Sequence, residues 1–403
     1  MSTSILYHGF GIRGYRYKRT YFAEGDLVFS IEKDPSTLRC PCCKGWHVIR
    51  HGAALRWFRA VPIGRKSIYI ALRVPRVECL SCGIVRQIDI GFADPRRTYT
   101  KAFERYVLEL SRHMTIRDVA RHLGISWDMV KDIQKRYLSK QYSQPRLRDL
   151  KLIAIDEISI GRGHRYLTVV LDLSSGAVVF VGDGKGADAL IPFWKKLKCS
   201  KAQIDAVAMD MSPSYISAVS TNLPKAAIVF DHFHIIKMFN DKLAELRREL
   251  QREAEDADKQ VLKGTRWLLL KNPENLRADR NERERLDAAL KLNKPLATAY
   301  YLKEDLRQLW LQKDQEKAAV FLDDWIAQAR SAGIKMLDNF ADTLESHRAG
   351  ILAYYEYPIS TGPLEGTNNK IKTLQKQAYG FRDMEFFKLK IYALHETKYA
   401  LVG

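Results

Sequence analysis

The sequence has no long apolar run. No stretch approaches the roughly 18 consecutive apolar residues that a membrane-spanning helix requires, and the opening MSTSILYHGFGIRGYRYK lacks the apolar core of a signal peptide. We therefore expect a cytoplasmic protein.

Length and composition indicate a globular protein with several domains. The chain has 403 residues, more than one ordinary domain holds, and 46% of them are hydrophobic while 28% are charged. We expect two to four domains.

Acidic residues are scarce in the first third of the chain. Residues 1–150 contain 28 lysines and arginines against 13 aspartates and glutamates, a net charge of +15. Residues 151–240 (10 against 8) and 241–403 (28 against 26) each carry only +2. Positive charge confined to one part of a chain is the electrostatic footprint of a nucleic-acid-binding module. The alternative is a basic surface with no nucleic-acid partner.

Cysteine is also rare, with six residues, but five of them fall between positions 40 and 82. In a cytoplasmic protein this clustering favours a metal site over disulfides. Cys40 and Cys43 form one CxxC pair, and Cys79 and Cys82 form a second. Two such pairs complete a tetrahedral structural zinc site. A redox-active pair is the alternative, but no thioredoxin-like βαβ pattern surrounds either CxxC.

The residues between the two cysteine pairs have the alternation of β-strands. Apolar side chains occur there at every second position: Ile68, Ile70, Leu72 and Val74. This pattern predicts a zinc-ribbon-like hairpin in an N-terminal module that spans residues 1–95. Cys42 is an alternative ligand to Cys40, and His47 and His51 are further alternatives that also fit as ordinary polar residues of the hairpin.

Residues 100–142 have apolar side chains at helical spacing. Their stretch TIRDVARHLGISWDMVKDIQKRY predicts a helix-turn-helix, in which a short helix ends at Gly124 and Ser126 caps a second helix. The second helix of such a motif enters the major groove of DNA. The residues that we expect to contact DNA are Arg117, Arg121, Trp127 and Lys131. A helical hairpin with no DNA partner is the alternative.

Residues 150–240 predict a sheet with helices. Buried-type strands end at Asp156, Asp210 and Asp231, and the order along the chain is βββαβαβα. An RNase H-like domain has this order, with its first and fourth strands adjacent and parallel. We therefore expect Asp156 and Asp210 at one edge of the sheet, where two carboxylates suit Mg²⁺ or Mn²⁺. The alternative is that these aspartates only form turns or cap helices.

Residues 241–345 are predominantly helical and highly charged, which predicts a helical insertion into this domain. Within it, we expect Trp267 to pack in the insertion's own core; stacking on an unpaired base is the alternative.

The last part of the chain, residues 346–403, contains STGPLEGTNNKIK. Glu365 fits the first turn of a helix, and it also supplies the third carboxylate that a metal site of two aspartates lacks. Lys370 and Lys372 follow within two turns, where they are placed to hold DNA phosphates or to form a solvated face.

Six short stretches in a fixed order resemble the DDE transposases of the ISL-three insertion-sequence family. They are IDE (155–157), GHRYLTVVLD (163–172), MDMSPSY (209–215), FDHFHIIK (230–237), RWLLLKNPENL (266–276) and GPLEGTNNKIK (362–372). The similarity covers nearly the whole chain, including the cysteine pairs and the helix-turn-helix. His232 stands where the family often has arginine, so a contact between residue 232 and a DNA phosphate stays open. Cys42 departs from the usual cysteine knuckle of the family, so the zinc ligand set also stays open.

The resemblance implies a multidomain α+β and α/β chain: a zinc-ribbon-like module, a helix-turn-helix, and an RNase H-like catalytic domain with a helical insertion. It implies that Asp156, Asp210 and Glu365 form the catalytic triad and hold two Mg²⁺ or Mn²⁺ ions, which would serve DNA cleavage and strand transfer at phosphorus. The implied substrate is double-stranded DNA, both the terminal inverted repeats and the target, and joining two ends implies at least a homodimer. The implied location is the bacterial cytoplasm, in association with the nucleoid.

Two other functions stay open. One is a non-catalytic, sequence-specific DNA-binding regulator derived from a transposase. The other is an RNase H-like nuclease that recognises DNA structure, although a zinc module and a helix-turn-helix suit sequence recognition better.

Overall fold

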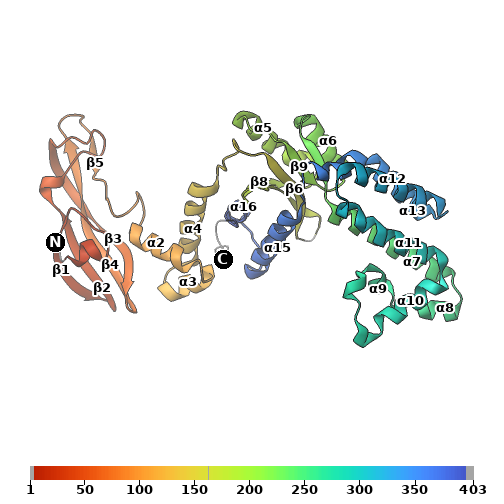
Figure 1. The fold of residues 1–403 in the computed structure, drawn as a ribbon. Coiled ribbons are helices and arrows are strands. Elements are labelled where there is room, and N and C mark those ends of the chain that lie inside the picture. The colour runs from red at the N-terminus through yellow and green to blue at the C-terminus, as the bar shows by residue number, and fades with distance from the viewer. Residues whose placement is uncertain (1–3, 162, 396–403) are drawn as a thin grey trace. The chain divides into compact units, whose positions relative to one another are not determined.

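The structure, a computed structural model, describes residues 4–161 and 163–395. Within these ranges the chain forms two compact units, each with its own sheet (Figure 1). The first unit contains the residues up to Ser143 together with Lys376–Lys390, and the second contains Gln144–Gln375 and a short piece that begins at Ile391. No helix in the described ranges is long and apolar enough to cross a membrane.

A five-stranded sheet begins the first unit, after the short helix α1 (Ile5–His8). Its strands are, in spatial order, β1 (Tyr15–Ala23), β2 (Asp26–Lys33), β4 (Lys66–Cys79) and β3 (Val48–Ile63), with β5 (Val85–Gln87) also paired to β4. β3 and β4 form a long antiparallel hairpin between the two cysteine pairs, as predicted. The alternating apolar residues of β4 are fully buried: Ile68, Ile70, Leu72 and Val74.

Three helices follow in the same unit: α2 (Lys101–Leu110), α3 (Ile116–Leu123) and α4 (Trp127–Tyr142). Gly124 ends α3 in the left-handed conformation, at φ 62°, which glycine adopts without a steric penalty. The Ser126 hydroxyl accepts a hydrogen bond from the Met129 N–H and so caps α4. The predicted helix-turn-helix geometry is confirmed at both of its turn residues.

The sheet of the second unit has the order β10 (Ala227–Phe230), β9 (Ala206–Met209), β6 (Leu152–Gly161), β7 (Arg165–Asp172) and β8 (Val178–Asp183). β6, β7 and β8 form an antiparallel meander, whereas β9 and β10 are parallel to β6. The first and fourth strands of this module are thus adjacent and parallel, as the element order predicted.

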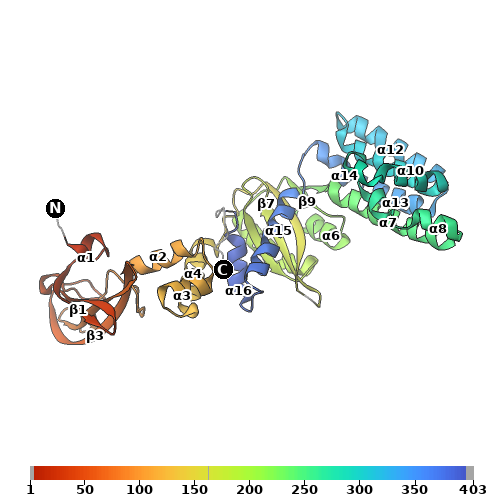
Figure 2. The ribbon, with the colours of Figure 1, turned by 90° about the horizontal axis from the view of Figure 1, so that it is seen from below.

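Helices cover both faces of this sheet (Figure 2). One face packs on α5 (Ile191–Ser200) and α6 (Pro213–Asn222) around a core that includes Phe193 and Val207. The other face meets α15 (Gly362–Gln377), whose Gln375 side chain donates a hydrogen bond to the Ile160 carbonyl. α16 (Met384–Tyr392) closes the described chain. The sheet therefore has α15 on the face opposite α5 and α6.

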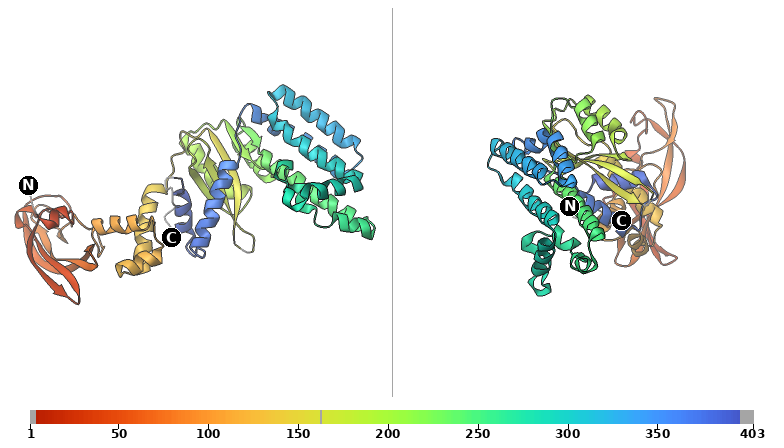
Figure 3. Two further views of the ribbon diagram at one scale, coloured as in Figure 1. Left: turned by 60° about the horizontal axis from the view of Figure 1, so that its bottom comes forward. Right: turned by 90° about the vertical axis from the view of Figure 1, so that its right-hand side faces the viewer.

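Helices fill the chain between β10 and α15, as predicted (Figure 3). They are α7 (His232–Glu253), α8 (Asp256–Leu262), α9 (Arg266–Leu270), α10 (Glu282–Leu292), α11 (Lys294–Leu306), α12 (Gln315–Ser331), α13 (Lys335–Ser346) and α14 (Arg348–Leu352). Their shared core holds Trp325, packed edge-to-face on Phe239 and Phe340. The expectation that Trp267 joins this core is wrong, because its neighbours Leu268 and Leu269 occupy the buried side of the single-turn helix α9 and leave the Trp267 side chain 64% exposed.

Candidate metal centres and DNA-binding surface

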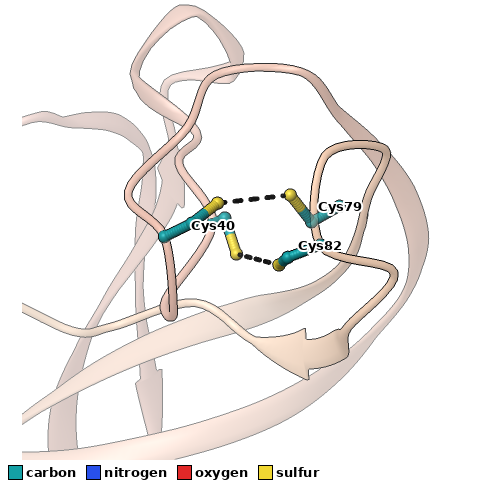
Figure 4. A group of neighbouring side chains, drawn as sticks. Cys40, Cys79 and Cys82 are labelled. Atoms are coloured by element: carbon teal, nitrogen blue, oxygen red, sulfur yellow. Dashed lines mark hydrogen bonds between the residues drawn. The ribbon is translucent and has the colours of Figure 1, made fainter.

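Four cysteine side chains converge from two loops of the first unit (Figure 4). The Sγ atoms of Cys40 and Cys82 are 3.6 Å apart, those of Cys43 and Cys79 are 3.5 Å apart, and all four lie within 4.8 Å of one another. Thiolates bound tetrahedrally at 2.3 Å would be about 3.8 Å apart, whereas a disulfide requires about 2.05 Å. The cluster therefore has the dimensions of a four-thiolate metal site.

The loops that carry these thiols are tight turns. The Cys40 N–H bonds to the Gly45 carbonyl, and the Gly83 N–H bonds to the Cys79 carbonyl. Removal from water raises the pKa of Cys79, but hydrogen bonds from the Cys82 and Ser81 N–H groups outweigh it and lower this pKa to about 6. Backbone donors aimed at sulfur stabilise a thiolate, which is the form that binds metal.

The pKa of Cys82 shifts in the opposite direction from that of Cys79, because of the contacts among the thiols. A hydrogen bond from the Ile84 N–H lowers its pKa, but the contact with Cys79 outweighs that effect and raises the value to about 12. A cation between the thiols would remove this conflict, so the donor set fits zinc. Cys42 is exposed and lies outside the cluster, as do His47 and His51 among the described residues, so the structure groups Cys40 with the other three.

The helix-turn-helix carries the four predicted DNA-contact residues on its two helices. Arg117, Arg121 and Trp127 are exposed, and Arg121 pairs with Asp118 one turn earlier at 3.4 Å. Lys131 instead forms an ion pair at 3.0 Å with Asp383. Asp383 lies in Lys376–Lys390, the returning segment that belongs to the same unit.

The register between β6 and β9 brings two carboxylates of the second unit together. Ala154 of β6 pairs with Ala208 of β9, so Asp156 and Asp210 each lie two residues further along adjacent parallel strands. The Asp156 side chain lies on the face that meets α15, whereas its neighbour Glu157 accepts a hydrogen bond from Tyr215 of α6 on the other face, at 3.3 Å. The two aspartates therefore lie side by side, as predicted, but the expectation that the first strand ends at Asp156 is wrong, because β6 stays paired with β7 as far as Gly161.

The environment of Asp156 disfavours its negative charge. Burial raises its pKa to about 6; the Glu157 N–H and the His234 charge oppose this shift, and the negative charges of Asp210 and Glu157 add to it. Two carboxylates that repel each other in a partly dry site become compatible when a divalent cation lies between them. The donor set is all oxygen, which fits Mg²⁺ or Mn²⁺.

α15 contributes to this site through Asn368. The Asn368 Nδ2 donates a hydrogen bond of 2.8 Å to Asp156 Oδ2, while its Oδ1 is buried without a hydrogen-bond partner. Glu365 lies three residues earlier, on the same side of the helix, and its side chain is exposed. Among the described residues, the carboxylate oxygens of Asp156, Asp210 and Glu365 are not gathered within 4.8 Å of one another. Lys370 and Lys372 are exposed on the same helix.

Asp231 joins the two ends of the helical insertion. This carboxylate is 2% exposed, caps α7 through the Phe233 N–H, and accepts a hydrogen bond from the Thr361 hydroxyl immediately before α15. The imidazoles of His232 and His234 lie at 3.4 and 3.5 Å from it. Burial raises the pKa of Asp231, but the His234 and Thr361 contacts outweigh it and lower this pKa overall. Asp231 therefore serves as a fixed anion and not as an open ligand site.

The sequence analysis missed Asn368, Thr361 and His234. His234 belongs to FDHFHIIK, and Asn368 lies at the helical spacing i+3 from Glu365, so both had a local signal. Thr361 had none, because its partner is 130 residues away.

Comparisons with known proteins point the same way. A family model described as a transposase matches residues 153–391, and a model described as the helix-turn-helix domain of transposase family ISL3 matches residues 88–138. The transposase for insertion sequence element IS1001 of Bordetella parapertussis is 31% identical over 390 residues, covering 95% of this chain and 96% of its own.

Other matches include the transposase of a second insertion sequence and a solved transposase complex. The transposase for insertion sequence element IS1557 of Mycobacterium tuberculosis is 31% identical over 369 residues, covering 85% of this chain and 82% of its own. The Drosophila P element transposase strand transfer complex aligns with a TM-score of 0.39 and 12% identity, over 76% of this chain and 94% of that chain.

Proposed function

Since this chain belongs to the ISL3 family of transposases, we propose that it binds the terminal inverted repeats of its own insertion sequence and catalyses strand cleavage and strand transfer with divalent metal ions. Its helix-turn-helix makes it a DNA-binding transposase. The single observation that carries the catalytic part of the proposal is the alignment of Asp156, within β6, with Asp210, directly after the end of the parallel strand β9, beside the helix that bears Glu365.

The architecture that we propose divides the chain by role. Residues 1–95 form a zinc-ribbon-like module, 100–142 the helix-turn-helix, and 150–240 with 346–403 an RNase H-like catalytic core that the helices of 241–345 interrupt. The strand order β10-β9-β6-β7-β8 supports the catalytic core, since it places the fourth strand beside the first. One zinc ion held by Cys40, Cys43, Cys79 and Cys82 would stabilise the first module, and the spacing of their sulfur atoms supports it.

Asp156, Asp210 and Glu365 are the residues that we assign to the catalytic metals. When bound, two Mg²⁺ or Mn²⁺ ions would supply an activated water or DNA 3′-hydroxyl and would stabilise the departing 3′-oxygen. Asp156 presents its carboxylate from within β6, with Oδ1 fixed by the Glu157 N–H and Oδ2 fixed by Asn368. The Ser212 N–H holds Asp210 in a similar way, at 3.1 Å.

Glu365 is placed through the backbone. The Glu365 N–H donates a hydrogen bond to the Thr361 carbonyl at 2.8 Å, and the Thr361 hydroxyl donates one to Asp231. These two bonds connect the first turn of α15, which follows the insertion, to Asp231, which precedes it. Bound cations would draw the exposed Glu365 side chain toward the two aspartates. Lys370 and Lys372, further along α15, would hold DNA phosphates near the metals.

Substitution of the triad tests the proposal. Asp156→Asn, Asp210→Asn and Glu365→Gln keep side-chain size and remove charge, so each is expected to abolish Mg²⁺- or Mn²⁺-dependent cleavage of terminal-repeat DNA while leaving DNA binding largely intact. Cleavage that persists in all three variants contradicts the catalytic assignment. Specific binding by a wild-type protein that cuts nothing with either metal would identify a DNA-binding regulator. Preference for a branched junction over repeat DNA would identify a structure-specific nuclease.

The assembly that we propose is a homodimer or larger on DNA, because two transposon ends must be held together for strand transfer. Measurement of the mass of the protein on repeat DNA, with one and with two ends present, tests it.

A further inference from the structure

A groove of about 950 Å³ lies inside the first unit, between the helix-turn-helix and the returning segment. One wall comes from α3 and the start of α4, with Arg117, Trp127 and Lys131. The other wall comes from residues 377–386, with Tyr379 and Arg382. The duplex-reading role of the helix-turn-helix does not account for this second wall, which is more than 200 residues away in sequence.

Ion pairs and aromatic packing hold the second wall in place. Asp383 lies 3.0 Å from Lys131 and 3.2 Å from Lys135, and Glu385 lies 2.6 Å from Lys135. Asp383 also caps α16 by accepting a hydrogen bond from the Phe386 N–H at 3.0 Å. The rings of Phe381 and Phe387 stack with centroids 4.5 Å apart. The groove is therefore a built feature with two anchored sides.

Two aromatic rings on these walls are open to solvent. Trp127, the first residue of α4, is 55% exposed, and Tyr379 is 100% exposed. Tyr379 has a left-handed backbone, at φ 51°, which is unfavourable for a non-glycine residue, and Gly380 follows at φ 96°. The Tyr379 ring is therefore wholly accessible to a stacking partner.

The charges around these rings are mostly positive. Arg117 and Arg382 are exposed, whereas Lys131 is paired with Asp383, so these four side chains carry a net charge of +2. The unit also contains most of the segment 1–150, whose net charge is +15. Exposed aromatic rings among cations bind single-stranded nucleic acid, because unpaired bases stack on the rings while their phosphates meet the cations.

We propose that this groove binds unpaired bases of DNA, with Tyr379 and Trp127 as stacking platforms and with Arg117 and Arg382 at the flanking phosphates. The inference rests on the proposed function, which brings DNA to this unit. Bases inside a duplex have both faces covered by their neighbours, so only a frayed, flipped or single-stranded base can reach the rings. The groove would thus hold a DNA strand that has left the duplex, beside the helices that read the intact duplex.

Fluorescence anisotropy with two probes tests the assignment, using full-length protein with a fluorescein-labelled 12-nucleotide oligothymidine and a labelled blunt 30-base-pair duplex. Stacking of one base contributes about 1–3 kcal/mol, so Tyr379→Ala is expected to weaken binding of the single strand about 5- to 150-fold. Duplex affinity is expected to stay within about twofold, and Tyr379→Phe should retain single-strand binding because it keeps the ring. Tyr301→Ala, at a 59% exposed tyrosine of the insertion, is the matched control and should change neither affinity.

A second variant probes the phosphate contact. Arg382→Ala should reduce the slope of log affinity against log salt for the single strand by about 0.7, the value for one lost phosphate contact. Wild-type protein that binds the duplex but not the oligothymidine overturns the groove assignment and leaves the proposed function intact. Equal single-strand affinity of Tyr379→Ala and wild type also overturns it. If the triad substitutions do not stop cleavage, the proposed catalytic function is wrong, whereas the assignment of the groove to unpaired bases is unaffected.

Discussion

Asn368 donates a hydrogen bond of 2.8 Å to Asp156, across 212 residues of sequence. This contact ties α15 to the middle of β6, at a point on the helix one turn beyond Glu365. Because Asn368 is only 6% exposed and its Oδ1 has no hydrogen-bond partner, the amide has an unused acceptor beside the carboxylate site. Asn368 is therefore a positioning residue for Asp156.

Removal of the Asn368 amide is expected to weaken metal binding. Loss of a partner that orients a ligand typically lowers metal affinity or activity 10- to 100-fold, so Asn368→Ala should raise the dissociation constant for Mn²⁺ by about that factor. Titration of Mn²⁺ followed by electron paramagnetic resonance measures binding independently of cleavage. Asn369→Ala, at the exposed neighbouring position, is the matched control. Unchanged Mn²⁺ affinity in Asn368→Ala would show that the hydrogen bond is only structural.

The metal-free protein should become less stable as pH rises through the range in which Asp156 ionises. Burial raises the pKa of Asp156 to about 6, whereas an unfolded chain releases this proton near pH 4. The folded state therefore holds the extra proton between these values, and the free energy of unfolding falls as pH rises across them, by about 3 kcal/mol at most. Asp156→Asn removes this penalty.

Thermal unfolding in EDTA checks this pH dependence. Asp156→Asn should melt at a higher temperature than wild type at pH 7 and at the same temperature near pH 4. Saturating Mg²⁺ should reduce the difference at pH 7, because the cation relieves the same repulsion in wild type. A gain of equal size at both pH values would assign the stabilisation to packing instead of charge.

Local patterns in the sequence predicted the parts of the fold that local forces determine. The alternation around Ile70 predicted the hairpin, Gly124 and Ser126 predicted the turn between two helices, and strand order predicted the pairing of β6 with β9. These features depend on periodicity, on a left-handed glycine or on a capping hydroxyl, all of which are visible within a few residues.

Contacts between distant segments could not be predicted in the same way. Nothing near Tyr379 shows that its segment packs on the helix-turn-helix, and the Lys131–Asp383 ion pair joins residues with no shared pattern. The exposure of Trp267 depends on which side of a single-turn helix Leu268 and Leu269 bury. Such choices follow from the shape of the whole core and not from a residue's own hydrophobicity.

The four-cysteine cluster is expected to hold one zinc ion per chain. Cys79→Ser removes a ligand whose sulfur lies 3.5 Å from Cys43, so zinc measured by atomic absorption should fall from one equivalent toward none. Because a structural zinc contributes folding free energy, this variant should also melt at a lower temperature and bind repeat DNA more weakly. Cys42→Ser, at the exposed cysteine outside the cluster, should keep its zinc. Full zinc content in Cys79→Ser would refute the site.

Loss of the hydrogen bond between the Thr361 hydroxyl and Asp231 is expected to lower both the free energy of unfolding and the rate of DNA cleavage. Both residues are at most 2% exposed, so Thr361→Val leaves a buried carboxylate oxygen without its donor and should cost about 1–3 kcal/mol. Because α15 begins at the next residue, Gly362, the same change should loosen Glu365 and lower the cleavage rate even at temperatures where all the protein is folded. Duplex binding by the helix-turn-helix should be unaffected, since that motif belongs to the other unit. Thr361→Ser keeps the hydroxyl and should restore most of the melting temperature and the rate. If the valine and serine variants behave alike in both assays, the hydrogen bond does not position Glu365.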